Sequence, residues 1–314
     1  MKKYRFYSGL IAFFLLACLC ALPAAALEDP APQCRAAIVV DGDYGDVLYA
    51  YNAYEKMYPA SITKIMTSLL VLEAVDSGQL TLDQPITAST TAAVVPEGSS
   101  TANPRIEAGE VLTVEQLLYC DLITSANEAC NILAETVGGS IENFVDMMNA
   151  RIAQIGCTGS QFRNPSGLND PEQVVTPYDM AMIAREAFDN EALLEIASAR
   201  SYRLPATINN PEGRSLTAER RILNTTDPDS QYYFPDAVAA KTGYTSLAGN
   251  TLVLYAERDG RSVISVVLKG SQPQYYFDSI SLLDFGLRQF QNVNILEHDP
   301  GFPSGEEPVT IGDR

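Results

Sequence analysis

The sequence predicts an α+β domain in which one antiparallel sheet gathers strands from both ends of the chain. Three observations support this fold class. A hairpin pattern near the N-terminus is followed by a long block with helical periodicity. Three runs rich in β-branched residues then precede a last helical segment. With 314 residues and 46% hydrophobic content, the chain is long enough to bury one large core.

The first predicted elements are a hairpin and a helix. Residues 34–51 place the apolar stretches CRAAIVV and VLYAY on either side of the turn-rich DGDYGD. Three aspartates in that turn resemble calcium ligands, but the other ligands of an EF-hand loop are missing, so we expect a plain turn. A helix is predicted from about Ala60 to Val75, with apolar residues on one face and Gly78 beyond its end.

Four more helices are predicted in the central block. TVEQLLYCDLI begins with Thr113 and Gln116 in the spacing of a capping box, and after a break at TSAN the next helix ends at glycines 138–139. IENFVDMMNARIAQIG has a strong amphipathic pattern. TPYDMAMIAREAF carries Thr176 as the N-cap and Pro177 at the first helical position.

The C-terminal part changes to strand patterns. AVAAKTGYT, NTLVLYAER and RSVISVVLK are rich in β-forming residues, and Asp259-Gly260 joins the last two as a tight turn. YYFDSISLLDFGLRQF is predicted to close the domain as a helix.

The N-terminal segment has the three parts of a secretory signal peptide. Basic residues at positions 2, 3 and 5 precede the apolar GLIAFFLLACLCALPA, and Ala24-Ala25-Ala26 offers an A-x-A cleavage site. The apolar run is a little short for a bilayer span. We therefore expect an exported protein cut near Ala26. A lipoprotein modified at Cys18 is the weaker alternative, because apolar residues continue past that cysteine.

Charge and cysteine content narrow the function classes. The formal net charge of −18 argues against nucleic acid and anionic membranes as partners, because both would repel the chain. No C-x-x-C or Cys/His cluster is present, so no metal or other cofactor is predicted. Outside the cytoplasm, the four cysteines beyond the signal segment would form two disulfides in any of three pairings, or remain buried thiols. They are Cys34, Cys120, Cys130 and Cys157.

Histidine is nearly absent. The one histidine, His298, lies in the polar tail EHDPGFPSGEEP. A Ser-His-Asp triad or a histidine-ligated zinc centre would need a histidine in the body of the domain, so neither is predicted. A catalytic serine in this chain would need another base.

Ser61 and Lys64 form the first candidate motif, S-x-x-K. Three residues apart on a helix, they share a face, so the lysine Nζ can reach the serine Oγ. The helix N-terminus adds backbone N–H donors and a positive dipole end, which suit a developing oxyanion. A lysine that acts as the base must be neutral near pH 7, and desolvation or a second cation nearby would favour that state. Taken alone, a helix start with a solvated lysine explains the pattern better.

Two further motifs carry polar side chains suited to the same chemistry. In Ser125-Ala126-Asn127 the hydroxyl can relay a proton and the amide can bind a peptide group. In Lys241-Thr242-Gly243 the amine and hydroxyl can hold a carboxylate, and the glycine lets a ligand lie against the strand. Taken alone, Ser125 is better explained as the N-cap of the following helix, and Lys241 as a solvated residue of an edge strand.

Each motif occurs once, in the order shared by penicillin-binding proteins and class A β-lactamases. The chain resembles in particular the low-molecular-weight penicillin-binding proteins that act as serine-type D-alanyl-D-alanine carboxypeptidases, peptidase family S11. The resemblance covers roughly residues 34–290 and includes FRNPSGLND, TPYDMAMIAR and AAKTGYTSLAGNTLV. It implies a β-lactamase/DD-peptidase-like fold, with an antiparallel sheet flanked by helices plus a helical subdomain.

The resemblance implies catalytic roles for three of these residues. Ser61 would be the acylated nucleophile and Lys64 its general base, while Ser125 would pass a proton toward the leaving D-alanine. The backbone N–H groups of Ser61 and Tyr244 would form the oxyanion hole. The acyl-enzyme would then be hydrolysed by water.

The resemblance also implies a substrate-binding set and its partners. Asn127 would bind the peptide backbone, Thr242 would hold the terminal carboxylate beside Gly243, and Lys241 would support the proton network electrostatically. The expected partners are peptidoglycan stem peptides, with β-lactam antibiotics as inhibitors that acylate the same serine.

The chain departs from the family pattern in three places. The second motif has Ala126 where the family usually has glycine, and Tyr244 follows K-T-G where many members carry histidine. Arg220 and Arg221 lie in the region of the family's carboxylate-binding arginine, but neither matches it convincingly.

The expected domain division is a signal peptide at 1–26, a DD-peptidase catalytic domain at 27–291, and a polar tail or the start of a missing C-terminal domain at 292–314. No membrane anchor is recognised in the chain. The expected location is extracytoplasmic: secreted, in the cell wall, or on the outer face of the plasma membrane.

Three alternatives remain. A D,D-endopeptidase acting on peptidoglycan cross-links would use the same groups. A class A β-lactamase needs a glutamate in E-x-x-L-N, and ERRILN at 219–224 has the wrong spacing and lies too near K-T-G. A non-catalytic wall-binding relative should lack a catalytic residue, and this chain keeps all of them.

Overall fold

The computed structural model describes residues 29–96, 99, 105–218 and 220–291. The predicted signal peptide at 1–26, the tail at 292–314 and His298 lie outside the described residues. The domain division therefore stays a prediction.

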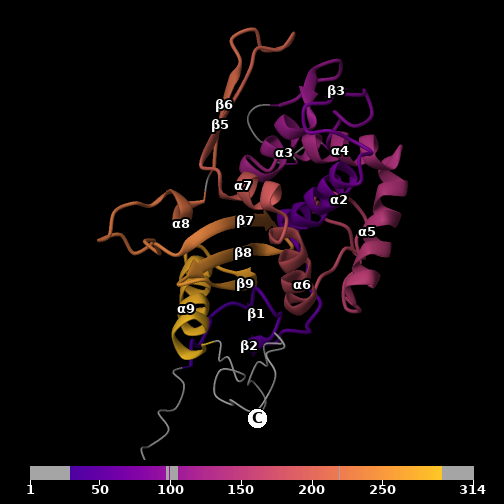
Figure 1. The fold of residues 1–314 in the computed structure, drawn as a ribbon. Coiled ribbons are helices and arrows are strands. Elements are labelled where there is room, and N and C mark those ends of the chain that lie inside the picture. The colour runs from indigo at the N-terminus through magenta and orange to yellow at the C-terminus, as the bar shows by residue number, and fades with distance from the viewer. Residues whose placement is uncertain (1–28, 97–98, 100–104, 219, 292–314) are drawn as a thin grey trace, which may run out of the picture.

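A five-stranded antiparallel sheet forms the centre of the molecule, in the order β2-β1-β9-β8-β7 (Figure 1). The first strand pairs with the last, with Ala37 opposite Val267, so the sheet joins both ends of the chain as predicted. The edge strand β7 contains K-T-G. The strands are β1 (Ala36–Asp41), β2 (Val47–Tyr51), β7 (Ala237–Thr245), β8 (Gly249–Arg258) and β9 (Arg261–Gly270).

Helices cover the sheet on both sides. α6 (Pro177–Phe188) packs on β1 and β9 from one side, and α9 (Gln274–Gln289) packs on β8 and β9 from the other (Figure 1). All six residues of β1 are therefore buried. Two apolar cores result, one between the sheet and the helical part and one beneath α9.

The helical part surrounds one central helix, α2 (Lys64–Asp76), which a 3₁₀ turn, η1 (Ala60–Thr63), precedes. Because α3 to α7 all contact α2, it is buried on nearly every side, and the prediction of a single apolar face was wrong. The surrounding helices are α3 (Val114–Ile123), α4 (Asn127–Gly138), α5 (Ile141–Ile155), α6 and α7 (Glu191–Ser198).

The local signals of the helix ends are confirmed. Thr113 and Gln116 form a capping box at the start of α3, and Thr176 caps α6 with Pro177 in its first turn. Gly139 ends α4 in the left-handed conformation. The fold is thus the predicted α+β arrangement, with an antiparallel sheet flanked by helices plus a helical subdomain.

Several short elements were not predicted. A two-stranded hairpin of Ser201–Leu204 and Arg214–Thr217 lies beside the helical part (Figure 1). A second small sheet pairs Pro85–Thr87, which follows α2, with Val111–Thr113, which leads into α3. Their strands are only three or four residues long, which leaves little periodicity to recognise. The elements are β3 (Pro85–Thr87), β4 (Val111–Thr113), β5 (Ser201–Leu204), β6 (Arg214–Thr217) and α8 (Arg221–Asn224).

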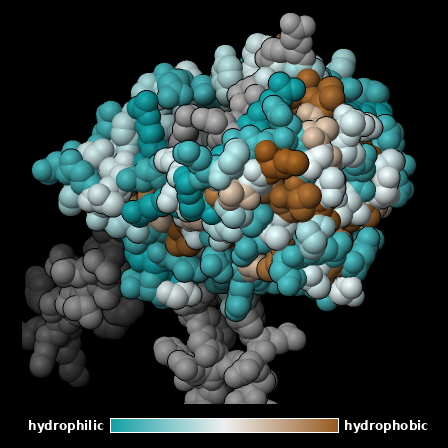
Figure 2. Space-filling view, turned by 90° about the horizontal axis from the view of Figure 1, so that it is seen from above, coloured by the Kyte–Doolittle hydropathy of each residue, from teal (hydrophilic) through white to brown (hydrophobic). Residues whose placement is uncertain are grey.

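Viewed from above, the surface is mostly hydrophilic, with hydrophobic side chains in small groups (Figure 2). This pattern matches the acidic composition of the chain. Among the helices of the described residues, none has the length and apolar character needed to cross a membrane.

Candidate active site

A cleft of about 1660 Å³ lies between the edge strand β7 and the junction of α3 and α4. All three sequence motifs reach it, although they are far apart in the chain. From the predicted set, the residues that line the cleft are Ser61, Ser125, Asn127, Lys241, Thr242, Gly243 and Tyr244. Lys64 lies behind Ser61 and is fully buried.

Two glycines allow the chain to close around Ser61. A Cβ on Gly243 would lie 2.7 Å from the Ser61 backbone nitrogen, and one on Gly167 would lie 1.8 Å from the Ala60 carbonyl oxygen. Ala60 itself has a φ of +51°, an uncommon conformation for a residue with a side chain. The backbone of the candidate nucleophile is therefore tightly confined between β7 and the loop that contains Gly167.

The Lys64 amine has a contact pattern suited to a base. Its Nζ donates to Asn127 Oδ1 at 2.8 Å and to the Ser166 carbonyl at 2.7 Å, and it lies 3.3 Å from Ser61 Oγ. A neutral amine has two N–H groups and one lone pair. Since the two N–H groups are engaged, the lone pair is left to accept the hydroxyl proton of Ser61.

Burial lowers the pKa of Lys64 because a charged amine loses its hydration there. Cys130, Asp121 and Glu128 oppose this effect by stabilising the protonated form. Desolvation is the larger influence, so the neutral form is favoured relative to an exposed lysine.

Ser125 connects the second motif to the third. It has a φ of +60° at the break between α3 and α4, and its Oγ accepts a hydrogen bond from Lys241 Nζ at 3.0 Å. The interpretation of Ser125 as a helix N-cap is wrong, because Ala126 occupies that position and no side chain caps the helix. The serine side chain is directed instead to the lysine of β7.

Lys241 is also buried, so it is not the solvated edge-strand lysine of the simpler interpretation. Its Nζ donates to the Thr242 carbonyl at 2.9 Å as well as to Ser125. Desolvation lowers its pKa, the positive charges of Lys64 and Arg220 lower it further, and Asp121 opposes them. Several basic groups and the carboxylate of Asp121 therefore influence one another in the interior below the cleft.

The charged side chains that line the described part of the cleft are all cationic: Lys241, Arg220 and Arg221. In a chain of net charge −18, this is a local reversal of sign that favours an anionic ligand. The two arginines differ in their contacts. Arg220 is buried and donates to the carbonyls of Ala197, Ala199 and Ala240, which anchors β7. Arg221 is more exposed and donates to the Tyr232 hydroxyl at 3.1 Å.

The sequence did not indicate which backbone carbonyl groups accept hydrogen bonds from Lys64 and from the side chains next to it. The Ser166 carbonyl accepts from Lys64, and the Pro165 carbonyl accepts from Thr67 at 2.7 Å and from Cys130 at 2.8 Å. Backbone acceptors carry no residue signature. The local clue was Asn164, whose Oδ1 accepts from the backbone of Ser166 and Gly167 and fixes the turn.

Asp121 and Glu128 were also missed, although both are fully buried near Lys64. For Asp121 the available signal was its place within the apolar run LLYCDLI, where a core position is expected.

The four cysteines of the described residues are buried free thiols, so none of the three disulfide pairings is present among them. The aspartate-rich turn before β2 is a plain turn, in which Asp41 Oδ1 accepts the N–H groups of Asp43 and Tyr44. Over residues 29–291, apart from the segments left undescribed, no cluster of three or more acidic, histidine or cysteine side chains could hold a metal ion.

Comparison with known sequences gives a consistent result. The model of the peptidase S11 family, D-alanyl-D-alanine carboxypeptidase, matches residues 24–272. D-alanyl-D-alanine carboxypeptidase DacF of Bacillus subtilis is 31% identical over 262 residues, which cover 83% of this chain and 64% of that protein. DacC of Escherichia coli is 31% identical over 297 residues, 92% of this chain and 69% of the relative. The chain thus spans about two thirds of the length of these relatives.

Solved structures agree with the sequence comparison. A D-alanyl-D-alanine carboxypeptidase from Mycobacterium tuberculosis superposes with a TM-score of 0.73 at 27% identity, covering 84% of this chain and 95% of that structure. Penicillin-binding protein D2 from Listeria monocytogenes, solved in its cefotaxime-bound form, has a TM-score of 0.69 at 26% identity, covering 82% and 98%.

Proposed function

The chain belongs to the peptidase S11 family of D-alanyl-D-alanine carboxypeptidases, and from this premise we propose that it removes the terminal D-alanine from peptidoglycan stem pentapeptides through an acyl-enzyme on Ser61. One observation carries the proposal. Ser61 Oγ lies 3.3 Å from a buried lysine amine whose two N–H groups are engaged elsewhere, which makes that amine an acceptor for the serine proton.

Acylation begins when Lys64 accepts the proton of Ser61 and the serine oxygen attacks the carbonyl carbon of the D-Ala–D-Ala peptide bond. The backbone N–H groups of Ser61 and Tyr244 stabilise the negative charge on the carbonyl oxygen. When the C–N bond breaks, the proton passes through Ser125 to the amine of the leaving D-alanine. Water then attacks the ester, and the stem peptide leaves with a free carboxylate while Ser61 regains its proton.

The remaining residues bind the substrate. Asn127 pairs with the peptide backbone, Thr242 holds the terminal carboxylate, and Gly243 leaves room for the stem peptide along β7. The cationic lining of the cleft supports a ligand that ends in a carboxylate, because Lys241 and the two arginines face it without a lining carboxylate among the described residues.

We place this reaction outside the cytoplasm, with export directed by the predicted signal peptide at 1–26. β-Lactams acylate Ser61 in place of the substrate. The cefotaxime-bound form of the Listeria relative supports this part of the proposal.

The decisive experiment is labelling with a fluorescent penicillin, followed by mapping of the labelled peptide. The label should lie on the peptide that contains Ser61, be lost in Ser61→Ala, and remain in Ser77→Ala, which removes an exposed serine at the end of α2. A label that survives Ser61→Ala, or no label on the unmodified protein, contradicts the proposal.

Substrate assays then separate the carboxypeptidase from an endopeptidase. Release of free D-alanine from a pentapeptide is expected, with little cleavage of cross-linked dimers. The reverse preference would replace the proposed reaction with the endopeptidase reaction.

A further inference from the structure

A second layer of polar side chains lies one helical turn below the candidate active site. Ser68 follows Lys64 by four residues on α2, Asp121 precedes Ser125 by four residues, and Cys130 follows Asn127 by three residues on α4. All three deeper side chains are completely buried. The layer is therefore built from the same segments that carry the serine and lysine motifs.

Asp121 is the carboxylate at the centre of this layer. Its Oδ2 accepts a hydrogen bond from Ser68 Oγ at 3.1 Å, and the Cys130 thiol also lies against it. Its Oδ1 has no hydrogen-bond partner among the described residues. A buried carboxylate with one unsatisfied oxygen is costly unless nearby charges offset its own.

The nearby charges that lower the pKa of Asp121 are those of Lys64 on α2 and Lys241 on β7. Burial has the larger and opposite effect and raises the pKa of Asp121 to about 6. Asp121 in turn stabilises the protonated form of both lysines. Glu128 on α4 acts on Lys64, and Arg220 before α8 acts on Lys241. Cys120, beside Asp121 on α3, is a buried neutral thiol.

We propose that Asp121 is a positioning residue for the reaction: its buried negative charge favours the protonated form of both motif lysines, and so sets the pH limits between which Lys64 can accept the proton of Ser61 while Lys241 keeps its own. This inference rests on the proposed function of Ser61 and Lys64. Without Asp121, the two amines would share a dry interior without the one carboxylate that acts on both, and each would lose its proton more readily.

The test is the pH dependence of acylation by a fluorescent penicillin, and of D-alanine release, for the wild-type chain and Asp121→Asn. Asparagine keeps the shape and can still accept from Ser68, but it removes the charge. Because an anion favours protonated amines, its loss should move both limbs of the profile to lower pH: the acid limb, where Lys64 takes up a proton, and the alkaline limb, where Lys241 loses one.

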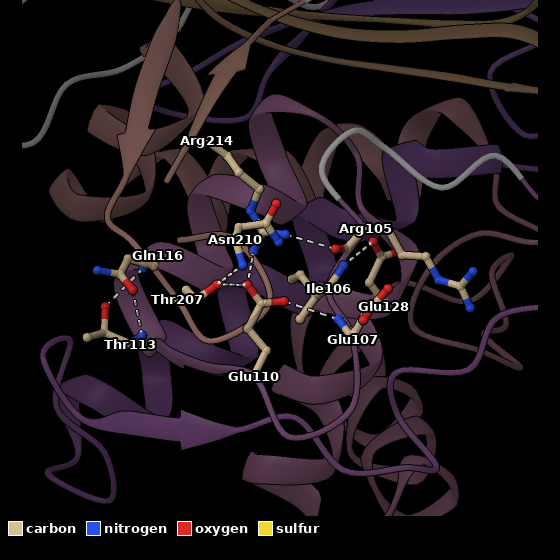
Figure 3. A network of polar contacts seen from close by, with 10 residues as sticks. All are labelled: Arg105, Ile106, Glu107, Glu110, Thr113, Gln116, Glu128, Thr207, Asn210 and Arg214. Carbon is tan, nitrogen blue, oxygen red and sulfur yellow. Dashed lines mark hydrogen bonds and ion pairs between the residues drawn. The ribbon is translucent and has the colours of Figure 1, made fainter. Parts of the chain in front are cut away.

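Glu128→Gln is the matched control, since Glu128 is a second fully buried acid and its Oε1 accepts from the Ile106 N–H at 3.1 Å (Figure 3). Glu128 acts on Lys64 but is not among the groups that act on Lys241. Glu128→Gln should therefore move the acid limb by a smaller amount and leave the alkaline limb in place.

Ser68→Ala provides a second variant if Asp121→Asn fails to fold, as judged by thermal melting. It retains every charge but removes the hydrogen bond that favours ionised Asp121, so the acid limb should move to lower pH and the alkaline limb should not.

The outcomes are distinct. Slower acylation with both limbs unmoved in Asp121→Asn would show a merely structural residue and overturn the inference. An unmoved acid limb in Ser68→Ala would do the same. If the wild-type chain takes no label on Ser61, the proposed function fails first and this inference falls with it.

Discussion

Among the buried charged side chains of the described residues, two clusters are built differently. One cluster joins Glu110, before β4, to Arg214 of β6, with Thr207 donating to Glu110 at 2.5 Å and Arg214 donating to the Arg105 carbonyl at 2.8 Å (Figure 3). The other holds Lys64 and Lys241 below the cleft, where their hydrogen bonds go to hydroxyl, amide and carbonyl oxygens.

The difference lies in how each positive charge is balanced. In the Glu110–Arg214 pair, a carboxylate contacts the guanidinium directly, and this contact fastens the β5–β6 hairpin to the helical part. In the lysine cluster no carboxylate contacts either amine in the described structure, and burial lowers both pKa values. A directly paired charge gives cohesion, whereas an amine without a contacting carboxylate is ready to exchange a proton.

The largest effect should come from Lys64→Met, which removes the proposed base and retains an unbranched apolar chain. Activity should fall by about 10²- to 10⁴-fold, the usual contribution of a general base. The free energy of unfolding should also depend less on pH. Because the pKa of Lys64 is lower in the folded state than its ordinary 10.5, the unfolded chain binds more protons below that value. The wild-type chain should therefore gain stability as pH rises from the lowered pKa toward 10.5, and the variant should lack that part of the gain.

Penicillin acylation rates and urea denaturation over a pH series measure both effects. The exposed Lys269→Met is the control and should change neither. A Lys64→Met protein that acylates at the wild-type rate would show that another group is the base. The proposed difference between a proton-exchanging lysine cluster and a cohesive Glu110–Arg214 cluster would then be wrong.

The fold and the motif residues could be predicted from the sequence, because each depends on a local or periodic signal. The capping box at Thr113 and Gln116, the runs of β-forming residues and the spacing of Ser61 and Lys64 are all such signals. The lysine contacts could not be predicted in the same way. The Ser166 carbonyl reaches Lys64 across 102 positions of the chain, and a backbone oxygen has no residue identity to recognise.

Long-range charge pairing is equally hard to predict. Glu110 and Arg214 are 104 positions apart, and a single acidic or basic residue in a loop or short strand reads as solvent-exposed. The β5–β6 hairpin that carries Arg214 was itself missed, since its strands are four residues long. The sequence thus predicts which residues meet at the cleft better than which groups surround them.

Glu110→Gln should have the next largest effect, and it should act on stability. It leaves the Arg214 guanidinium buried without its carboxylate, which costs about 3–5 kcal/mol of unfolding free energy. The pH limits of penicillin acylation should not move, because neither residue is among the groups that act on the two lysines. Urea denaturation and the acylation profile of the folded fraction measure the two quantities.

The double variant Glu110→Met with Arg214→Met is the control for this pair. Removing both charges should recover much of the lost stability, because no unpaired charge remains. A moved pH profile in Glu110→Gln would show that the Glu110–Arg214 cluster also sets the proton balance of the active site, and the two clusters would have to be treated as one.

The smallest effect is expected at a surface pair that shares the chemistry of Glu110–Arg214 but not its burial. Arg35 and Glu55 are joined at 2.9 Å with side chains 61% and 37% exposed, whereas Arg214 and Glu110 are 7% and 0% exposed. Because water already solvates both charges, a double-mutant cycle with Arg35→Ala and Glu55→Ala should give a coupling of about 0.2–1 kcal/mol. High salt should reduce it further. A coupling as large as that of the buried pair would show that burial does not explain the strength of the Glu110–Arg214 contact. The attachment of the hairpin would then depend on the contact geometry that both pairs share.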